Sequence, residues 1–139
     1  MKSLGTLIRL RKHNLDEARR ELTALQQAVD AVNQAREDLD RELADESATA
    51  RDDIEASYRY GNYLVTVRER HRLLDQQEHE LQQKIALAEA AVREAFRDLK
   101  QFEIADAQRL EQERAEAGRQ EQAALDEVAL SAFRSQENG

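Results

Sequence analysis

The sequence predicts an all-α protein, a long antiparallel two-helix coiled-coil hairpin whose second helix is longer than the first. More than half of the 139 residues are Ala, Glu, Lys, Leu or Arg, a composition typical of coiled coils. The chain contains no Pro and only four Gly, and its apolar residues recur every three or four positions. We therefore expect residues 1–139 to form a single elongated coiled-coil module.

The first helix is predicted over about residues 4–46. Apolar residues alternate at spacings of four and three from Leu4 to Leu43, and Arg11 and Arg36 are the two exceptions in this series. Such a narrow stripe is typical of a coiled-coil seam, the line of side chains along which two helices pack. The stripe broadens toward Leu7 and Leu10, which indicates additional apolar surface near the start.

A turn is predicted over about residues 47–54. This stretch contains small, acidic and hydroxyl-bearing residues but no large side chain that a seam would bury. Ser, Thr and Asp favour caps and turns because their side chains compete for backbone hydrogen bonds. Neither Gly nor Pro marks the turn, so one uninterrupted helix remains an alternative.

The second helix is predicted over about residues 54–134. Its seam runs from Leu64 to Phe102, with polar residues at His71 and Glu78. Between residues 105 and 124 only Leu110 is large and apolar, whereas apolar residues return at 125–133. If the shorter first helix reaches only as far as residue 105 of the second, with its start at that point, residues 105–134 have no partner within the hairpin. They are then either a docking surface or a frayed end.

The charge distribution favours the antiparallel pairing. The net charge is −8, and residues 37–55 carry −7 whereas residues 1–20 carry +4. A hairpin places the acidic block beside the arginines at 59–72 and the basic block beside Glu103 and Asp106. Nucleic acid is a poor partner because duplex binders normally present a basic face along the chain.

No residue pattern indicates an enzyme, a cofactor or a metal site. The chain has no Cys, its Gly residues are isolated, and His71 and His79 are too far apart for a one-turn zinc pair. No apolar run reaches the length of a transmembrane helix and the start lacks the apolar core of a signal peptide, so the sequence predicts a cytosolic protein without membrane insertion. The tyrosines at 58, 60 and 63 either cap the hairpin tip or bind a partner.

The sequence resembles the FliJ family of the flagellar type III export apparatus. The opening Leu4-Gly5-Thr6-Leu7-Ile8-Arg9-Leu10-Arg11-Lys12 is similar to the start of that family. Residues 119–129, with Arg, Gln, an apolar residue, Asp-Glu and Ala in that order, are similar to the family's end. Asn62-Tyr63 is similar to the start of the family's second helix.

The resemblance implies a non-enzymatic stalk between a hexameric flagellar export ATPase and the membrane protein of the export gate. It also implies contact with export chaperones and a location at the flagellar base, peripheral to the inner membrane. The implied ATPase-ring contacts are Leu4, Leu7, Ile8, Arg9, Arg11, Arg119, Gln122, Leu125, Asp126 and Glu127. The implied gate contacts are Leu39, Tyr58, Tyr60 and Tyr63.

Two other interpretations remain open. A self-associating coiled-coil scaffold would form a longer rod of two parallel chains, whereas the stalk is expected to be a monomeric hairpin when alone. The equivalent stalk of a virulence secretion system, or a rotary-ATPase subunit, would share the hairpin but serve a different machine.

Overall fold

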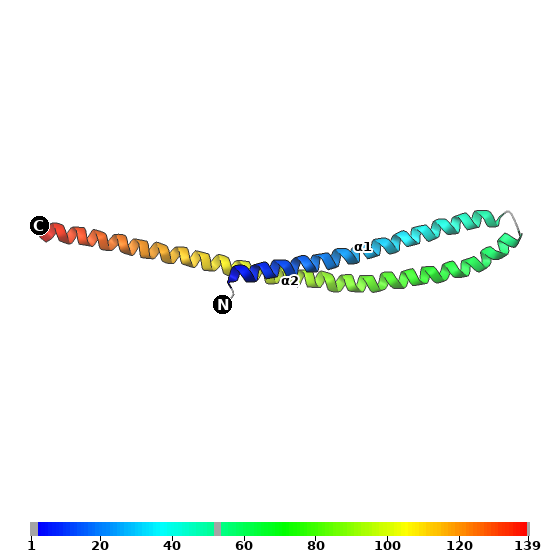
Figure 1. Cartoon of the computed structure of the whole chain (residues 1–139), viewed down its shortest axis with the longest axis horizontal. Helices are drawn as coiled ribbons and strands as arrows, with labels where there is room; N and C mark the ends of the chain where they lie inside the picture. Colours follow the sequence, from blue (N-terminus) through cyan, green and yellow to red (C-terminus); the bar gives the residue numbers. More distant parts are fainter. Residues whose placement is uncertain (1–2, 52–53, 139) are drawn as a thin grey trace. The chain divides into compact units, whose positions relative to one another are not determined.

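A computed structural model describes residues 3–51 and 54–138, and these residues form two α-helices and no strand (Figure 1). Helix α1 spans Leu4–Ala50, and helix α2 spans Ile54–Asn138. The predicted all-α hairpin with a longer second helix is confirmed. One uninterrupted helix is wrong, because α1 and α2 are separate elements that run in opposite directions within residues 13–96.

Helix α1 is longer than predicted, because residues 47–50 are helical rather than part of the turn. The hydroxyl of Thr49 donates to the carbonyl oxygen of Asp45 at 3.1 Å, one helical turn earlier. The hydroxyl is thereby satisfied inside the helix and does not compete with it. The predicted turn is shortened to the residues after Ala50, of which 52 and 53 lie outside the described residues. Helix α2 also continues four residues beyond the predicted 134.

The chain divides into two compact units. One unit contains residues 13–96, and the other contains residues 1–12 together with residues 97–139.

The first unit, residues 13–96, is an antiparallel helix pair with an apolar seam. Full burial of a large apolar side chain in such a seam stabilises the folded state by about 1.5–3 kcal/mol. The most buried seam residues are at most 8% exposed and come from both helices: Leu15, Val32, Leu39, Val67, Ile85 and Ala88.

Ion pairs across this unit follow the same antiparallel register. Arg36 lies opposite Glu78, with its Nη2 atom 2.5 Å from Glu78 Oε2 and 2.8 Å from Asp75 Oδ1. The polar seam residues Arg36 and Glu78 therefore pair with each other across the seam. Nearer the turn, Glu42 pairs with Arg70 at 3.6 Å, as the charge pattern predicts.

The second unit combines the first turns of α1 with the last part of α2. The backbone N–H of Thr6 donates to the Ser3 hydroxyl at 3.3 Å, so Ser3 caps the start of α1. Leu99 is 6% exposed, whereas every described residue from 107 to 138 is exposed. The seam of this unit thus ends near residue 106, close to the position expected from the length of α1.

Candidate functional site

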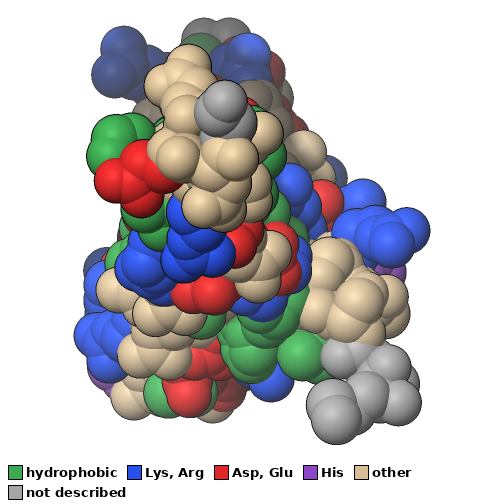
Figure 2. All heavy atoms as spheres, turned by 90° about the vertical axis from the view of Figure 1, so that its left-hand side faces the viewer, with side chains coloured by type: hydrophobic (Ala, Val, Ile, Leu, Met, Phe, Trp, Pro, Cys, Tyr) green, Lys and Arg blue, Asp and Glu red, His purple; other side chains and the backbone are tan. Residues whose placement is uncertain are grey.

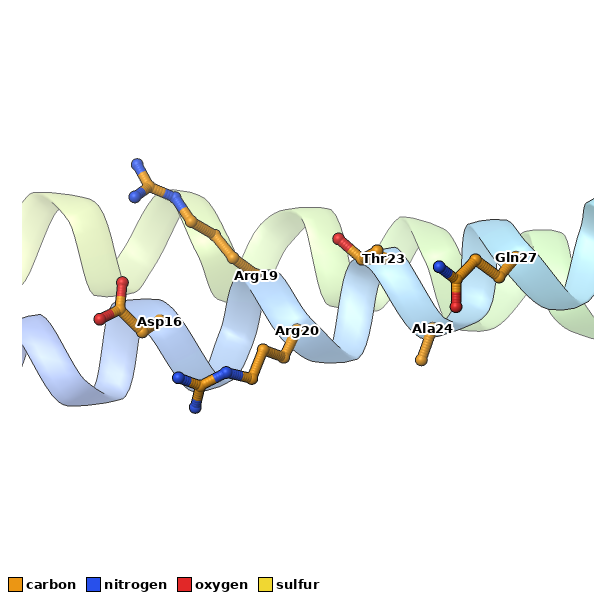
Figure 3. Close-up of a pocket in the computed structure, with 6 residues that line it drawn as sticks. All are labelled: Asp16, Arg19, Arg20, Thr23, Ala24 and Gln27. Atoms are coloured by element: carbon orange, nitrogen blue, oxygen red, sulfur yellow. The ribbon is translucent and has the colours of Figure 1, made fainter.

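The described residues contain no group of three or more His, Asp or Glu side chains that could hold a metal ion. One surface pocket is lined only by residues of α1 between Asp16 and Gln27 (Figure 3). Its side chains diverge, since Arg19 and Arg20 point in opposite directions (Figure 3). The residues of this pocket therefore do not converge on one point, and the sites predicted from the sequence are contact surfaces.

The expected ATPase-ring residues of α1 lie in its first two turns. Leu4, Leu7 and Ile8 are half-buried, and Arg9 is exposed with its Nε donating to the carbonyl oxygen of Gly5 at 3.4 Å. These side chains belong to the unit formed with residues 97–139. Their apolar atoms pack only in part within the chain, which leaves area for a partner.

Arg11 occupies a different environment from the other residues in this group. Its guanidinium carbon lies 5.2 Å from the centroid of the Phe102 ring, within the range of a cation–π interaction. Its Nε atom is buried and has no hydrogen-bond partner among the described residues. The side chain therefore packs against α2, and this contact explains how a charged residue occupies a seam position.

The expected ring-binding residues of α2 lie on its exposed terminal part. Arg119 Nη2 is 2.5 Å from Glu116 Oε2, and the Gln122 amide donates to Asp126 Oδ1 at 3.0 Å. Leu125 is 58% exposed. Arg119, Gln122 and Asp126 are thus held by neighbours on their own helix, whereas Leu125 and Glu127 are exposed.

The structure separates the two groups of expected ring-binding residues. Arg11 packs beside Phe102, and Arg119 lies 17 residues further along α2. At 1.5 Å per residue this is about 26 Å along the helix axis. The residues from α1 and those from α2 therefore form two contact groups rather than one patch.

Exposed apolar side chains continue beyond Leu125. Val128 is 66% exposed and Phe133 is 59% exposed, and helical spacing places both on the side of α2 that carries Leu125. We call Leu125, Val128, Ala129, Ala132 and Phe133 the terminal stripe. The end view shows hydrophobic, acidic and basic side chains interspersed rather than a continuous basic face (Figure 2).

The expected gate residues differ in exposure. Tyr58 is 79% exposed, Tyr60 and Tyr63 are half-buried, and Leu39 is only 5% exposed. The Tyr63 hydroxyl oxygen is buried and has no hydrogen-bond partner of ordinary geometry among the described residues. Burial raises the pKa of Tyr63, and the nearby Glu42 carboxylate raises it further. Among these four residues, Tyr58 offers a partner the largest accessible fraction.

Leu39 nevertheless borders a groove between α1 and α2 with a volume of about 380 Å³. Leu73, which is 46% exposed, and Leu74 supply further apolar surface to the groove. Asp38, Glu42, Arg70 and Gln77 add polar groups. Leu73 is not among the predicted gate contacts, although two adjacent leucines widen the apolar face beyond what a narrow seam requires and indicate additional surface.

No helix among the described residues is both long enough and apolar enough to cross a bilayer. Both helices are long, but charged residues interrupt every apolar stretch of the printed sequence.

Comparison with known proteins gives one result. No curated protein and no solved structure matches the chain significantly. The family model described as "Flagellar FliJ protein" matches residues 1–138, almost the entire sequence. This match agrees with the features derived above: two long helices, an apolar seam, and sequence at both ends similar to the family pattern. The chain belongs to the FliJ family of flagellar proteins.

Proposed function

We propose that this protein is a non-enzymatic stalk that connects the hexameric flagellar export ATPase to the membrane protein of the export gate. Family membership supports a role related to flagellar protein export. In our proposal the end that carries both termini binds inside the ATPase ring, and the rest of the hairpin binds the gate and export chaperones. The protein would act in the cytoplasm, peripherally associated with the inner membrane, and would be monomeric when alone.

The observation that carries this proposal is the exposed terminal part of α2. Leu125, Val128 and Phe133 are all more than half exposed, on a helix that α1 does not cover. Apolar side chains grouped on one side of an exposed helix are typical of an interaction surface. Residues 100–139 carry a net charge of −4, which disfavours nucleic acid and anionic lipid as the partner and favours a protein.

The helix pair suits a mechanical role. In residues 13–96 the apolar seam and the Arg36–Glu78 pair within it fix the register of the two helices. A coiled coil with a fixed register transmits position along its length with little bending. Nucleotide hydrolysis would belong to the ATPase alone.

The groove beside Leu39 and Leu73 is the proposed gate-binding surface. It combines an apolar floor with the Arg70–Glu42 ion pair at its side, so a partner would need apolar residues flanked by polar ones. Tyr58 is the exposed aromatic nearer the turn, and exposed tyrosines often dominate binding energy at interfaces.

A second candidate is a self-associating scaffold, because the terminal stripe could also pack against a second copy of the chain. Sedimentation of the purified protein separates the two functions. A monomer at micromolar concentration supports the stalk, whereas a stable dimer that depends on Leu125 supports the scaffold.

The test is the ATP hydrolysis rate of the export ATPase from the same organism, with and without the full chain. We expect the chain to stimulate hydrolysis and expect truncation after Arg114 to remove the effect. Leu125→Ser combined with Val128→Ser should weaken the stimulation several-fold. Leu110→Ser, at a residue 43% exposed and outside the terminal stripe, is the matched control and should leave it unchanged.

Two results would contradict the proposal. One is the absence of both stimulation and co-sedimentation with the ATPase ring. The other is equal stimulation by the full and truncated chains, which would exclude the terminal stripe as the ring contact.

The gate contact requires a separate assay. We expect the cytoplasmic part of the gate protein to retain the wild-type chain in a pull-down and to lose Leu73→Ser. Leu87→Ser, at a residue 73% exposed outside the groove, is the control. Equal retention of both variants would exclude the groove as the gate-binding surface.

A further inference from the structure

Residues 105–124 of α2 are helical, and from residue 107 onward no other helix among the described residues covers them. Every residue from 107 onward in this segment is exposed, and Leu110 is its one large apolar residue. An amphipathic face buried against a partner normally supplies most of the stability of a helix. Another source of stability must therefore act here.

Side-chain pairs one helical turn apart provide that source. Arg109 Nη2 lies 3.1 Å from Asp106 Oδ1, and Arg109 Nη1 lies 2.7 Å from Glu113 Oε1. Arg109 therefore connects residues over two helical turns. Pairs at spacings of three and four stabilise an isolated helix. The hydrogen bond to Asp106, followed by the charge of Glu113, raises the pKa of Arg109.

Similar pairs extend along the segment. Glu116 accepts from Arg119 at 2.5 Å and from the Gln120 amide at 3.5 Å. The Gln122 amide donates to Asp126 at 3.0 Å, so these contacts reach from residue 106 to the start of the terminal stripe.

The residue composition of this segment, and the helix that precedes it, also favour the helical state. Apart from Asp106 and Gly118, residues 105–124 are Ala, Arg, Glu, Gln or Leu, the strongest helix formers. The segment also continues a helix whose residues 97–102 already pack beside α1, as Leu99 and Phe102 show. The unfavourable nucleation step is thus complete before residue 105, and only propagation is required.

We propose that residues 105–124 are a self-supporting single α-helix, held by these side-chain pairs, that acts as a stiff spacer without any partner. The spacer would keep the terminal stripe at a fixed distance from the α1 contact group. This use rests on the proposed function, whereas the helical state of the free chain does not.

The proposal can be tested by pulsed EPR distance measurement on the full chain. The sequence has no Cys, so spin labels at Gln101→Cys and Ala123→Cys would be the only ones present. A helix gives a narrow distribution near 33 Å for these 22 residues, at about 1.5 Å per residue. A flexible chain gives a broad distribution with a root-mean-square value of about 26 Å.

Two matched variants identify the role of the charges. Arg109→Glu with Arg119→Glu makes the pairs repulsive, and we expect it to broaden the distribution at least about twofold, since like charges at these spacings destabilise a helix. Arg109→Lys with Arg119→Lys keeps the charge and should retain the narrow peak. Circular dichroism checks that the hairpin itself remains folded.

Three outcomes would overturn the proposal. They are a broad distribution in the unaltered background, a narrow one in all three proteins, and a dipolar signal from singly labelled chains, which would mean that a second copy supports the helix. No ATPase is present in this experiment. Its failure would therefore leave the ring contact standing, and failure of the ring contact would leave the spacer standing.

Discussion

Residues 13–96 and residues 107–138 are both helical, but different interactions hold them. In residues 13–96, side chains such as Leu15 and Ile85 are buried between α1 and α2. In residues 107–138 every residue is exposed, and the contacts are pairs such as Arg109–Glu113 within one helix. Secondary structure alone therefore does not show whether a segment is stabilised by packing or by local pairs.

The leucines of the two regions differ in whether they stabilise the fold or remain available for binding. A leucine in the seam, such as Leu15, is occupied by its packing and is not available to another protein. A leucine in the terminal stripe, such as Leu125, contributes almost nothing to the fold and is available to a partner. Substitutions at these two positions should consequently affect different measurements.

The largest expected effect is on global stability. Leu15→Ala removes a side chain that is 4% exposed and should lower the free energy of unfolding by about 2–4 kcal/mol. Leu125→Ala, at 58% exposure, should change it by less than about 0.5 kcal/mol. Urea titration followed by circular dichroism measures both. Equal shifts would mean that the terminal stripe is packed in solution.

The Arg36–Glu78 pair gives the next largest effect. Arg36→Ala leaves the half-buried Glu78 carboxylate without its main partner and should lower the urea midpoint, though less than Leu15→Ala does. The double variant Arg36→Leu with Glu78→Leu should recover that loss, because an apolar pair continues the seam. A double variant less stable than Arg36→Ala would show that the ion pair adds more than the seam can replace.

Glycine substitution compares the two regions with the same chemical change. Gly61 and Gly118 lie inside α2, and an added methyl group meets no atom within 4 Å at either position. Alanine should therefore stabilise the helix by about 1 kcal/mol at each position. We expect Gly61→Ala to raise the urea midpoint. Gly118→Ala should instead slow amide exchange only in neighbouring residues, because residues 107–138 can unfold without the seam.

Hydrogen exchange with mass spectrometry distinguishes these outcomes. A rise of the global midpoint with Gly118→Ala would show that residues 107–138 unfold together with the hairpin. The two regions would then form one cooperative unit.

The hairpin was predictable because its signals are local and repeated. The alternation from Leu4 to Leu43 and the weak stretch after residue 105 predict both helices and their unequal lengths. The sequence places the end of α1 too early, because the small, acidic and hydroxyl-bearing residues after 46, Thr49 among them, are typical of turns. The bond of Thr49 to the Asp45 carbonyl depends on a side-chain rotamer that composition cannot reveal.

The candidate surfaces were less predictable. The exposure of the terminal stripe follows from helix length, since α1 is too short to cover it. The packing of Arg11 on Phe102 depends on the register across the pair, to within one residue. The groove beside Leu73 likewise depends on which side chains of two helices lie opposite each other, and no single heptad contains that information.

The smallest expected effect is a pH dependence limited to the paired region. Tyr63 lies in residues 13–96, and residues 107–138 contain no tyrosine. Burial of its hydroxyl, with a further contribution from Glu42, raises the pKa of Tyr63 in the folded state. The protonated phenol therefore binds its proton more tightly when folded than when unfolded. The stability that depends on this proton is complete below the unfolded pKa of about 10.

That contribution is lost as the pH rises through the folded pKa of Tyr63. Tyr63→Phe removes the group and should reduce the fall in the urea midpoint between pH 9 and pH 11, by a margin smaller than the shifts described above. At pH 7 the variant should be at least as stable as the wild type, because the buried hydroxyl has no hydrogen-bond partner of ordinary geometry among the described residues. Tyr58→Phe, at a residue 79% exposed, is the control and should keep the wild-type pH profile. Destabilisation by Tyr63→Phe at pH 7 would instead show that the hydroxyl binds Glu42 in solution.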